Sequence, residues 1–316
     1  MPVRPQVDNV KGRPPVDTVT VRAPAKVNLH LAVGLLRPDG YHDLTTVFHA
    51  VSLYDELTVT PGPALTISVE GEGADQVPTD HTNLAARAVL VLSEQYGRDP
   101  GVHLHLRKGI PVAGGCAGGS ADAAAALVAC DVLWGLGLSR AELSAIGATL
   151  GSDVPFSLHG GTALGTGRGE QLTPVLGAGA YSWVLALADG GLSTPAVYGE
   201  LDRQREHGPV SVVSDSAEVL SALRQGSADV LGRALSNDLQ PAAMALKPEL
   251  RRLLDSGDDL GALGGVVSGS GPTVAFLARD DKHATALAAA LSGHGVCRAV
   301  RVAEGPVPGA RVIRTS

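Results

Sequence analysis

Apolar and polar residues alternate over a long segment near the start of the chain. Between Val19 and Val33 the odd positions are apolar, whereas Lys26, Asn28 and His30 share the opposite face. A period of two is typical of a β-strand, because successive side chains point to opposite sides of a sheet. We therefore predict a strand with one face in the core and one in solvent. Other strands are predicted at 45–53, 56–60, 65–70, 102–107, 158–166, 183–187, 264–268, 273–278 and 297–302.

Helical patterns lie between these strands. Apolar residues recur three or four positions apart over 83–96, and the pattern stops at Gly97, as in a helix that ends on glycine. Ser139 and Glu142 have the spacing of a capping box, which predicts a helix reaching Leu150. Further helices are predicted at 120–134, 195–206, 217–224, 228–234, 248–255 and 282–291.

Interleaved helices and strands, with the early strands adjacent in sequence, predict an α+β protein with two lobes. We expect residues 1–17 to form a disordered tail, because they are polar and rich in proline. The N-terminal lobe is assigned to 18–165 and the C-terminal lobe to 166–316. The last strand, near 306–316, is expected to return to the N-terminal lobe.

Composition restricts the class of protein. Of the 316 residues 44% are hydrophobic and 18% are charged, which excludes an intrinsically disordered chain. The net charge of −7 repels DNA, RNA and anionic membranes. Aromatic residues make up 3%, too few for the stacking platforms of a single-strand nucleic-acid binder. A small-molecule substrate is expected, and an anionic one would need a local positive potential.

The cysteines and the apolar stretches indicate the compartment of the protein and whether a zinc site is expected. Cys116, Cys130 and Cys297 are far apart and form no C-x-x-C pair, so neither a disulfide framework nor a zinc site is predicted. The first residues contain no apolar segment of a secretory signal. Asp122 and Asp131 interrupt the longest apolar stretch, so no membrane span is expected. A cytoplasmic protein with reduced thiols fits these features.

The strongest chemical motif is the glycine-rich segment from Pro111 to Asp122, which runs directly into the predicted Ala-rich helix. Glycine allows positive φ and close approach of an anion, and a helix start supplies unpaired N–H groups. Together these features predict a phosphate cradle. The segment is neither a Walker A loop nor a G-x-G-x-x-G motif. A glycine-rich turn with a tightly packed helix is the alternative.

Two other glycine clusters are ambiguous on their own. The segment 268–273 lies between two predicted strands and by itself favours a plain turn. The segment 165–169 resembles a nucleotide loop, but no helix clearly follows it, so we interpret it as a loop between the lobes.

Two charged residues are candidates for catalysis. Asp153 lies in a short linker after a predicted helix, where a carboxylate can act as a general base toward a hydroxyl. Lys26 lies beside Asn28 on the polar face of the first strand and can bind an anion or keep a base ionised. The alternatives are a solvated aspartate in a turn and an exposed lysine on a strand. Zinc-protease and serine-esterase motifs are absent, since no H-E-x-x-H or G-x-S-x-G frame occurs.

Four segments occur in an order that resembles the GHMP kinase superfamily. They are 23–28, 111–121, 151–155 and 268–273. Within it, 25–29 together with 37–42 and 46–48 resembles the 4-diphosphocytidyl-2-C-methyl-D-erythritol kinase family of the non-mevalonate isoprenoid pathway. The resemblance covers nearly the whole chain after residue 18. It implies the two-lobed GHMP kinase fold, with a ribosomal-protein-S5-like α/β N-terminal lobe and a C-terminal α/β lobe that has an antiparallel sheet.

The resemblance implies transfer of the γ-phosphoryl group of ATP to the 2-hydroxyl of the cytidylyl substrate, with Mg²⁺. By position, Asp153 corresponds to the base and Lys26 to its electrostatic partner. Ser120 would lie near Mg²⁺. The ATP phosphates would contact Pro111, Val112, Ala113, Gly114, Gly115, Cys116, Ala117, Gly118, Gly119, Ser120 and Ala121.

The remaining family positions concern the two bases. Asn28, Tyr41, His42, Thr194 and Tyr198 fall where the family holds its substrate, with His42 at the cytosine edge and Tyr198 stacked on the ring. Asn83 and Lys108 fall at the adenosine end, and Lys108 and Arg168 are further candidates for attracting anions. The chain departs from the pattern at Cys116, where a larger apolar residue is expected, and no glutamate for Mg²⁺ can be assigned.

Two other functions remain open. One is a superfamily kinase for homoserine or a mevalonate derivative, against which Tyr41, His42 and Tyr198 indicate a cytosine pocket. The other is a non-catalytic binding protein on the same scaffold. Monomer and homodimer are equally compatible with the sequence.

Overall fold

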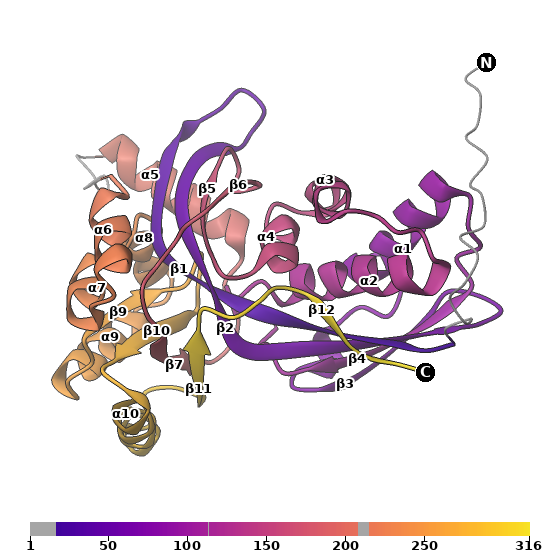
Figure 1. The fold of residues 1–316 in the computed structure, drawn as a ribbon. Coiled ribbons are helices and arrows are strands. Elements are labelled where there is room, and N and C mark those ends of the chain that lie inside the picture. Colours follow the sequence, from indigo (N-terminus) through magenta and orange to yellow (C-terminus); the bar gives the residue numbers. More distant parts are fainter. Residues whose placement is uncertain (1–16, 113, 208–214) are drawn as a thin grey trace.

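The computed structural model describes residues 17–112, 114–207 and 215–316 and contains two lobes (Figure 1). The sheet of the first lobe has the order β12-β1-β2-β4-β3. Its strands are antiparallel except that β3 runs parallel to β4. Their bounds are β1 Val19–Leu36, β2 His42–Pro61, β3 Thr66–Gly71, β4 Val102–Lys108 and β12 Arg311–Thr315.

Helices cover one face of this sheet (Figure 1). The central one is buried on all sides from Ala121 to Cys130, which explains why its sequence lacks an amphipathic pattern. Burial on all sides fixes the helix and therefore the position of its N-terminus. The helices of this lobe are α1 Leu84–Tyr96, α2 Gly118–Trp134, α3 Arg140–Leu150 and α4 Val154–His159, with a short 3₁₀ helix η1 at Ala74–Gln76.

Two short strands, β5 Thr162–Thr166 and β6 Gln171–Pro174, extend the first sheet beside β2. The chain then crosses to the second lobe, whose sheet is fully antiparallel with the order β11-β7-β10-β9. Its strands are β7 Tyr181–Leu187, β9 Gly264–Val267, β10 Thr273–Ala278 and β11 Ala299–Gly305. Its helices are α5 Thr194–His207, α6 Ala217–Gln225, α7 Ala228–Ala234, α8 Gln240–Leu246, α9 Glu249–Asp259 and α10 Asp281–His294, and β8 Ser236–Asn237 pairs with β1.

The long strand β1 belongs to both cores. Its first half packs in the core of the first lobe, whereas Leu31 and Val33 pack in that of the second. The prediction that one face meets solvent was wrong, because Lys26, Asn28 and His30 are at most 5% exposed. The second lobe and the loops of the site cover that face, so its polar side chains lie between lobes.

Three other predictions on local structure were wrong. The strand assigned to 158–166 begins at Thr162, because its first residues end the helix α4, which carries Pro155 in its first turn. The segments 45–53 and 56–60 form one strand, β2. The cluster 165–169 does not join the lobes, because it lies at the turn between β5 and β6 of one sheet.

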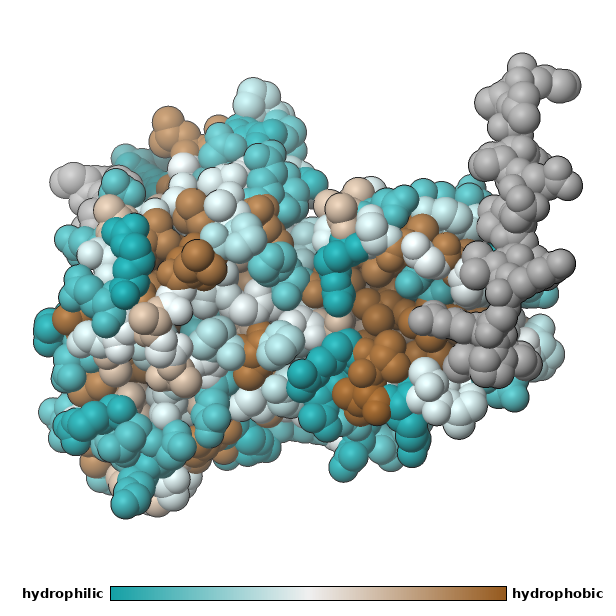
Figure 2. All heavy atoms as spheres, viewed as in Figure 1, coloured by the Kyte–Doolittle hydropathy of each residue, from teal (hydrophilic) through white to brown (hydrophobic). Residues whose placement is uncertain are grey.

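The surface in Figure 2 mixes hydrophilic and hydrophobic residues, and one apolar area lies where Figure 1 draws β12. Val312 and Ile313 of that strand are 37% and 42% exposed. Within the described ranges, no helix has both the length and the apolar character that a membrane span needs.

Candidate active site

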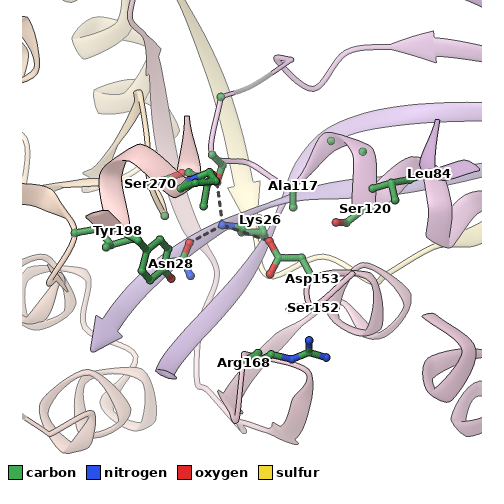
Figure 3. Close-up of a pocket in the computed structure, with 18 of the residues that line it drawn as sticks. Lys26, Asn28, Leu84, Ala117, Ser120, Ser152, Asp153, Arg168, Tyr198 and Ser270 are labelled. Carbon is green, nitrogen blue, oxygen red and sulfur yellow. Dashed lines mark hydrogen bonds and ion pairs between the residues drawn. The ribbon is translucent and has the colours of Figure 1, made fainter. Parts of the chain in front are cut away.

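A pocket of about 900 Å³ lies between the two lobes. Residues of β1 and of the glycine-rich segment line it from the first lobe, and residues of α5 and of the turn after β9 line it from the second (Figure 3). Most of the predicted site residues come together here: Lys26, Asn28, Tyr41, His42, Asn83, Lys108, Pro111, Val112, Gly114, Gly115, Ala117, Gly118, Gly119, Ser120, Asp153, Thr194 and Tyr198. Cys116 and Ala121 are buried behind the lining, and Ala113 lies outside the described residues.

The start of α2 presents its N–H groups to this pocket. Ala117 occupies the N-cap position with a φ of 62°, and no side chain caps the helix. Serine or aspartate usually fills this position and satisfies the first amides, which alanine cannot do. The first amides are therefore available to an anion, and the helix dipole favours negative charge there.

Gly115 fixes the shape of the loop before this helix. Its φ is +75°, and a Cβ there would lie 2.2 Å from the carbonyl oxygen of Ser268. No side chain fits at that distance, so the loop packs backbone to backbone against the turn after β9. This observation favours a built cradle over a merely glycine-rich turn.

The second glycine cluster forms the other wall of the cradle. The hydroxyl of Ser268 donates to the carbonyl of Gly115 at 3.1 Å, and the amide of Thr273 donates to that of Gly114 at 3.3 Å. The side-chain amide of Asn237 donates to the carbonyl of Gly269 at 2.8 Å and holds the turn in place. The cluster is therefore part of the site, although its sequence alone favoured a plain turn.

Lys26 lies at the centre of the pocket. Its Nζ donates to Asn28 Oδ1 at 2.6 Å and to the carbonyl of Gly115 at 2.9 Å. The amide of Asn28 in turn donates to the hydroxyl of Thr46 at 2.8 Å, which orients its oxygen toward the lysine. Because Lys26 is only 5% exposed, the alternative of an exposed strand lysine is excluded.

The side chain of Asp153 lies beside the ammonium of Lys26. Asp153 occupies the N-cap position of α4, but its side chain does not cap that helix. The carboxylate therefore remains available, with Oδ2 at 3.9 Å from Lys26 Nζ and the side chain 32% exposed. This partial burial beside a cation differs from the solvated turn aspartate that was the alternative.

A cluster of aromatic and polar side chains lies at the end of the pocket that is nearest the second lobe. His42 Nε2 lies 2.9 Å from Asp202 Oδ1, and the rings of His42 and Tyr198 are 5.1 Å apart. Burial, with Asp153 nearby, raises the pKa of the Tyr198 hydroxyl, so it stays protonated. Thr194 Oγ1 lies 2.8 Å from Ser270 Oγ, which joins α5 to the turn after β9.

The cations that line the pocket differ in how their charge is balanced. Lys26 lies beside Asp153, and Lys108 bonds to both Asp55 and Asp122. Arg168 has no carboxylate ion pair among the described residues, and its guanidinium lies 5.0 Å from the centre of the Tyr41 ring. Arg168 is therefore the pocket cation with charge in excess.

The end of the pocket beside α1 contains residues that the sequence did not indicate. Gln76, Val77 and Pro78, in and after η1, line the pocket together with Leu84. Asn83 caps α1 and donates to the carbonyl of Pro78 at 2.7 Å, so it holds this segment in place. No spacing rule marks these residues, because an irregular segment supplies them.

A divalent cation would depend on few protein ligands. The described residues contain no group of three or more His, Cys, Asp or Glu side chains able to hold a metal. A Cβ on Gly151 would lie 4.0 Å from the Ser120 hydroxyl, which places that oxygen at the turn before Asp153. Hydroxyl and carboxylate oxygens suit Mg²⁺, which usually keeps phosphate and water ligands as well.

Comparisons with known proteins match both lobes. The family model of the GHMP kinases N terminal domain matches residues 83–161, and that of the GHMP kinases C terminal matches 219–297. The 4-diphosphocytidyl-2-C-methyl-D-erythritol kinase of Nocardia farcinica is 62% identical over 93% of this chain and 96% of its own length. That of Mycobacterium tuberculosis strain H37Rv is 58% identical over 95% and 94%.

Two solved structures superpose on most of this chain. A crystal structure of 4-(cytidine 5'-diphospho)-2C-methyl-D-erythritol kinase superposes with a TM-score of 0.73 at 34% identity and covers 90% of this chain and 98% of that one. Homoserine kinase from Cytophaga hutchinsonii also gives 0.73, but at 20% identity, with 96% and 100% covered. The latter likeness concerns the fold alone.

Proposed function

This chain belongs to the GHMP kinase family, and from that premise we propose that it phosphorylates the 2-hydroxyl of 4-diphosphocytidyl-2-C-methyl-D-erythritol with ATP. The pairing of Lys26 with Asp153 beside an uncapped helix start is the observation that carries the proposal. The identity of 62% to a kinase of that name supports the choice of substrate. The reaction would belong to non-mevalonate isoprenoid biosynthesis.

The ATP phosphates would lie at the N-terminus of α2, against the backbone of Gly114–Gly119. Phosphoryl transfer depends mainly on positioning and on electrostatic stabilisation. The amides of the helix start fulfil both needs, because they are fixed and directed at the anion. Mg²⁺, held by the phosphates and the Ser120 hydroxyl, would neutralise charge on the nucleotide when bound.

Asp153 would act as general base toward the substrate hydroxyl. A base must reach the proton it accepts, and the carboxylate of Asp153 is free of helix capping and faces the pocket. Lys26 would offset the negative charge of that carboxylate and stabilise charge on the transferring group. Its bonds to Asn28 and Gly115 hold the ammonium at the cradle without neutralising it.

The cytidine would lie between the lobes, at His42 and Tyr198. The ring of Tyr198 offers a stacking surface, and His42, oriented by Asp202, offers a hydrogen bond to the edge of a base. Arg168 would bind the diphosphate, since its charge is not balanced by a carboxylate pair among the described residues. A pocket for homoserine or mevalonate needs no stacking surface for a base, because neither molecule contains one.

An ADP-release assay with Mg²⁺ tests the proposal. 4-Diphosphocytidyl-2-C-methyl-D-erythritol, homoserine, mevalonate and phosphomevalonate are compared as acceptors. Turnover with the cytidylyl substrate alone is expected. Turnover with another alcohol would refute the substrate, and ATP binding without turnover would favour a non-catalytic protein.

A further inference from the structure

Three buried charged side chains lie beneath the phosphate cradle. They are Asp55 on β2, Lys108 at the end of β4 and Asp122 on α2, each at most 5% exposed. The Nζ of Lys108 donates to Asp55 Oδ2 at 2.5 Å and to Asp122 Oδ2 at 2.6 Å. We refer to these three residues as the 55–108–122 cluster.

The cluster is joined to both ends of the phosphate loop. The second oxygen of Asp55 accepts hydrogen bonds from the amides of Gly109 and Ile110, at 2.8 and 2.9 Å, where the chain leaves β4. Asp122 lies on the helix into which the loop runs. Lys108 bonds to both carboxylates and so connects the start of the loop to its end.

The ammonium of Lys108 also packs against the start of α2. A Cβ on Gly118 would lie 3.5 Å from Lys108 Nζ and 3.3 Å from Ile110 Cγ2. The ammonium therefore lies directly against the first residue of α2. Burial lowers the pKa of Lys108, but Asp122 and Asp55 outweigh this effect and raise it, so the lysine is charged.

Stability is a poor explanation for such a cluster. Buried ion groups lose much of their hydration, and apolar residues of equal volume often stabilise a fold as well or better. A cation beneath the positive end of a helix is a further cost. The cluster offsets these costs with two carboxylates and connects both ends of the cradle. We therefore explain it by the geometry that it imposes on the phosphate loop and the start of α2.

We propose that Lys108 and Asp122 are positioning residues for the nucleotide, which hold the first turn of α2 in register with the phosphate loop. The proposal rests on the assignment of this loop to the phosphates of ATP. The Lys108–Asp122 contact would orient the amides of Gly118–Ser120 toward the phosphates before the nucleotide binds. Loss of the Lys108–Asp122 bond should weaken nucleotide binding more than it affects the other substrate.

Two variants at one position separate positioning from charge. Asp122→Asn keeps an oxygen that can accept from Lys108 and removes an ionisable carboxyl group near the phosphates, whose pKa burial raises. Asp122→Ala removes both, and leaves Lys108 paired with Asp55, so no buried charge is unbalanced. If the alanine variant is poorly soluble, Asp122→Leu fills the space and breaks the same bond.

The test is calorimetric titration of the full-length chain with the non-hydrolysable analogue AMP-PNP and Mg²⁺. We expect Asp122→Ala to weaken binding about tenfold, with Asp122→Asn within twofold of the wild type or tighter. The KM for the cytidylyl substrate should change less than twofold in both. Glu56→Gln is the matched control, because it removes the half-buried Arg22 ion pair one residue from Asp55 and should leave binding unchanged.

The proposal would be overturned if the dissociation constant of AMP-PNP changed equally in the alanine and asparagine variants. It would also be overturned if Asp122→Ala bound AMP-PNP within twofold of the wild type. A lower melting temperature with unchanged affinity would mean that the cluster serves stability alone. The titration uses no acceptor substrate. Its outcome therefore stands even if the assignment of the cytidylyl substrate fails.

Discussion

The ammonium of Lys26 lies 3.9 Å from a carboxylate oxygen of Asp153, and both side chains line the pocket between the lobes. This distance exceeds that of a hydrogen bond, so each group keeps capacity for a third partner. Lys26 uses its other donors on Asn28 and Gly115, whereas Asp153 caps no helix. The arrangement suits an ion pair in which Asp153 accepts from a reacting hydroxyl while Lys26 donates to a phosphoryl group.

Replacement of Asp153 by asparagine should abolish general-base catalysis and leave the nucleotide site intact. We expect kcat to fall on the order of 10² or more, since the variant loses both the base and its charge. AMP-PNP binding should stay within twofold, because the cradle does not use this side chain. Steady-state kinetics and titration on the same preparation check both values, and a near-normal kcat would remove Asp153 from this role.

Tyr198 should determine the KM for the cytidylyl substrate but not that for ATP. Stacking of a base on an aromatic ring contributes ~1–3 kcal/mol, so Tyr198→Ala should raise this KM by about five- to a hundredfold. Tyr198→Phe keeps the ring and is the matched control, with a KM close to that of the wild type. An unchanged KM in the alanine variant would rule out stacking.

Arg168 should discriminate between cytidine and CDP as competitive inhibitors. Charge-assisted hydrogen bonds to phosphate contribute ~1.5–3 kcal/mol, so Arg168→Met should weaken CDP binding by about ten- to a hundredfold. Cytidine, which has no phosphate, should bind equally well to both proteins. An equal loss for both inhibitors would mean that Arg168 supports the pocket only through its contact with Tyr41.

The stability of the fold should fall in mild acid because of His49. Burial lowers the pKa of this histidine to about 4, although a backbone contact with Gly305 opposes the shift. The unfolded chain, with an ordinary pKa near 6.5, then binds a proton that the folded chain refuses. Stability is therefore lost as the pH falls below about 6.5, by about 2 kcal/mol between pH 7 and pH 5.

Urea denaturation of the wild type and of His49→Gln at several pH values checks this prediction. Glutamine does not titrate, so the difference in unfolding free energy between the two proteins should shrink toward low pH. A difference that is the same at pH 7 and pH 5 would contradict the assignment.

Much of the fold could be predicted from local sequence. The capping box of Ser139 and Glu142 forms with both of its hydrogen bonds, and the predicted bounds of α7 and β10 match the structure. The short helices α4 and α8 were missed. Each is too short for a helical period to be distinguished from a buried apolar run.

The site was only partly accessible to sequence reasoning. Motif spacing indicated Lys26, Asp153 and the cradle, but not the burial of Lys26, because tertiary packing covers the polar face of β1. The contact of Gly115 with Ser268 joins segments far apart in the chain. The pairing of Lys108 with Asp55 and Asp122 depends likewise on sheet and helix packing, which no local pattern encodes.

Identification of the phosphorylated position tests the central claim most directly. After turnover with ATP and 4-diphosphocytidyl-2-C-methyl-D-erythritol, the product is examined by proton-coupled phosphorus NMR. Carbon 2 carries the methyl group and no hydrogen, so a 2-phosphate is expected to give a phosphomonoester singlet. A phosphomonoester signal that is split by neighbouring protons would place the new phosphate on another hydroxyl. Inorganic phosphate alone would mean transfer to water, and either result would contradict the proposed reaction.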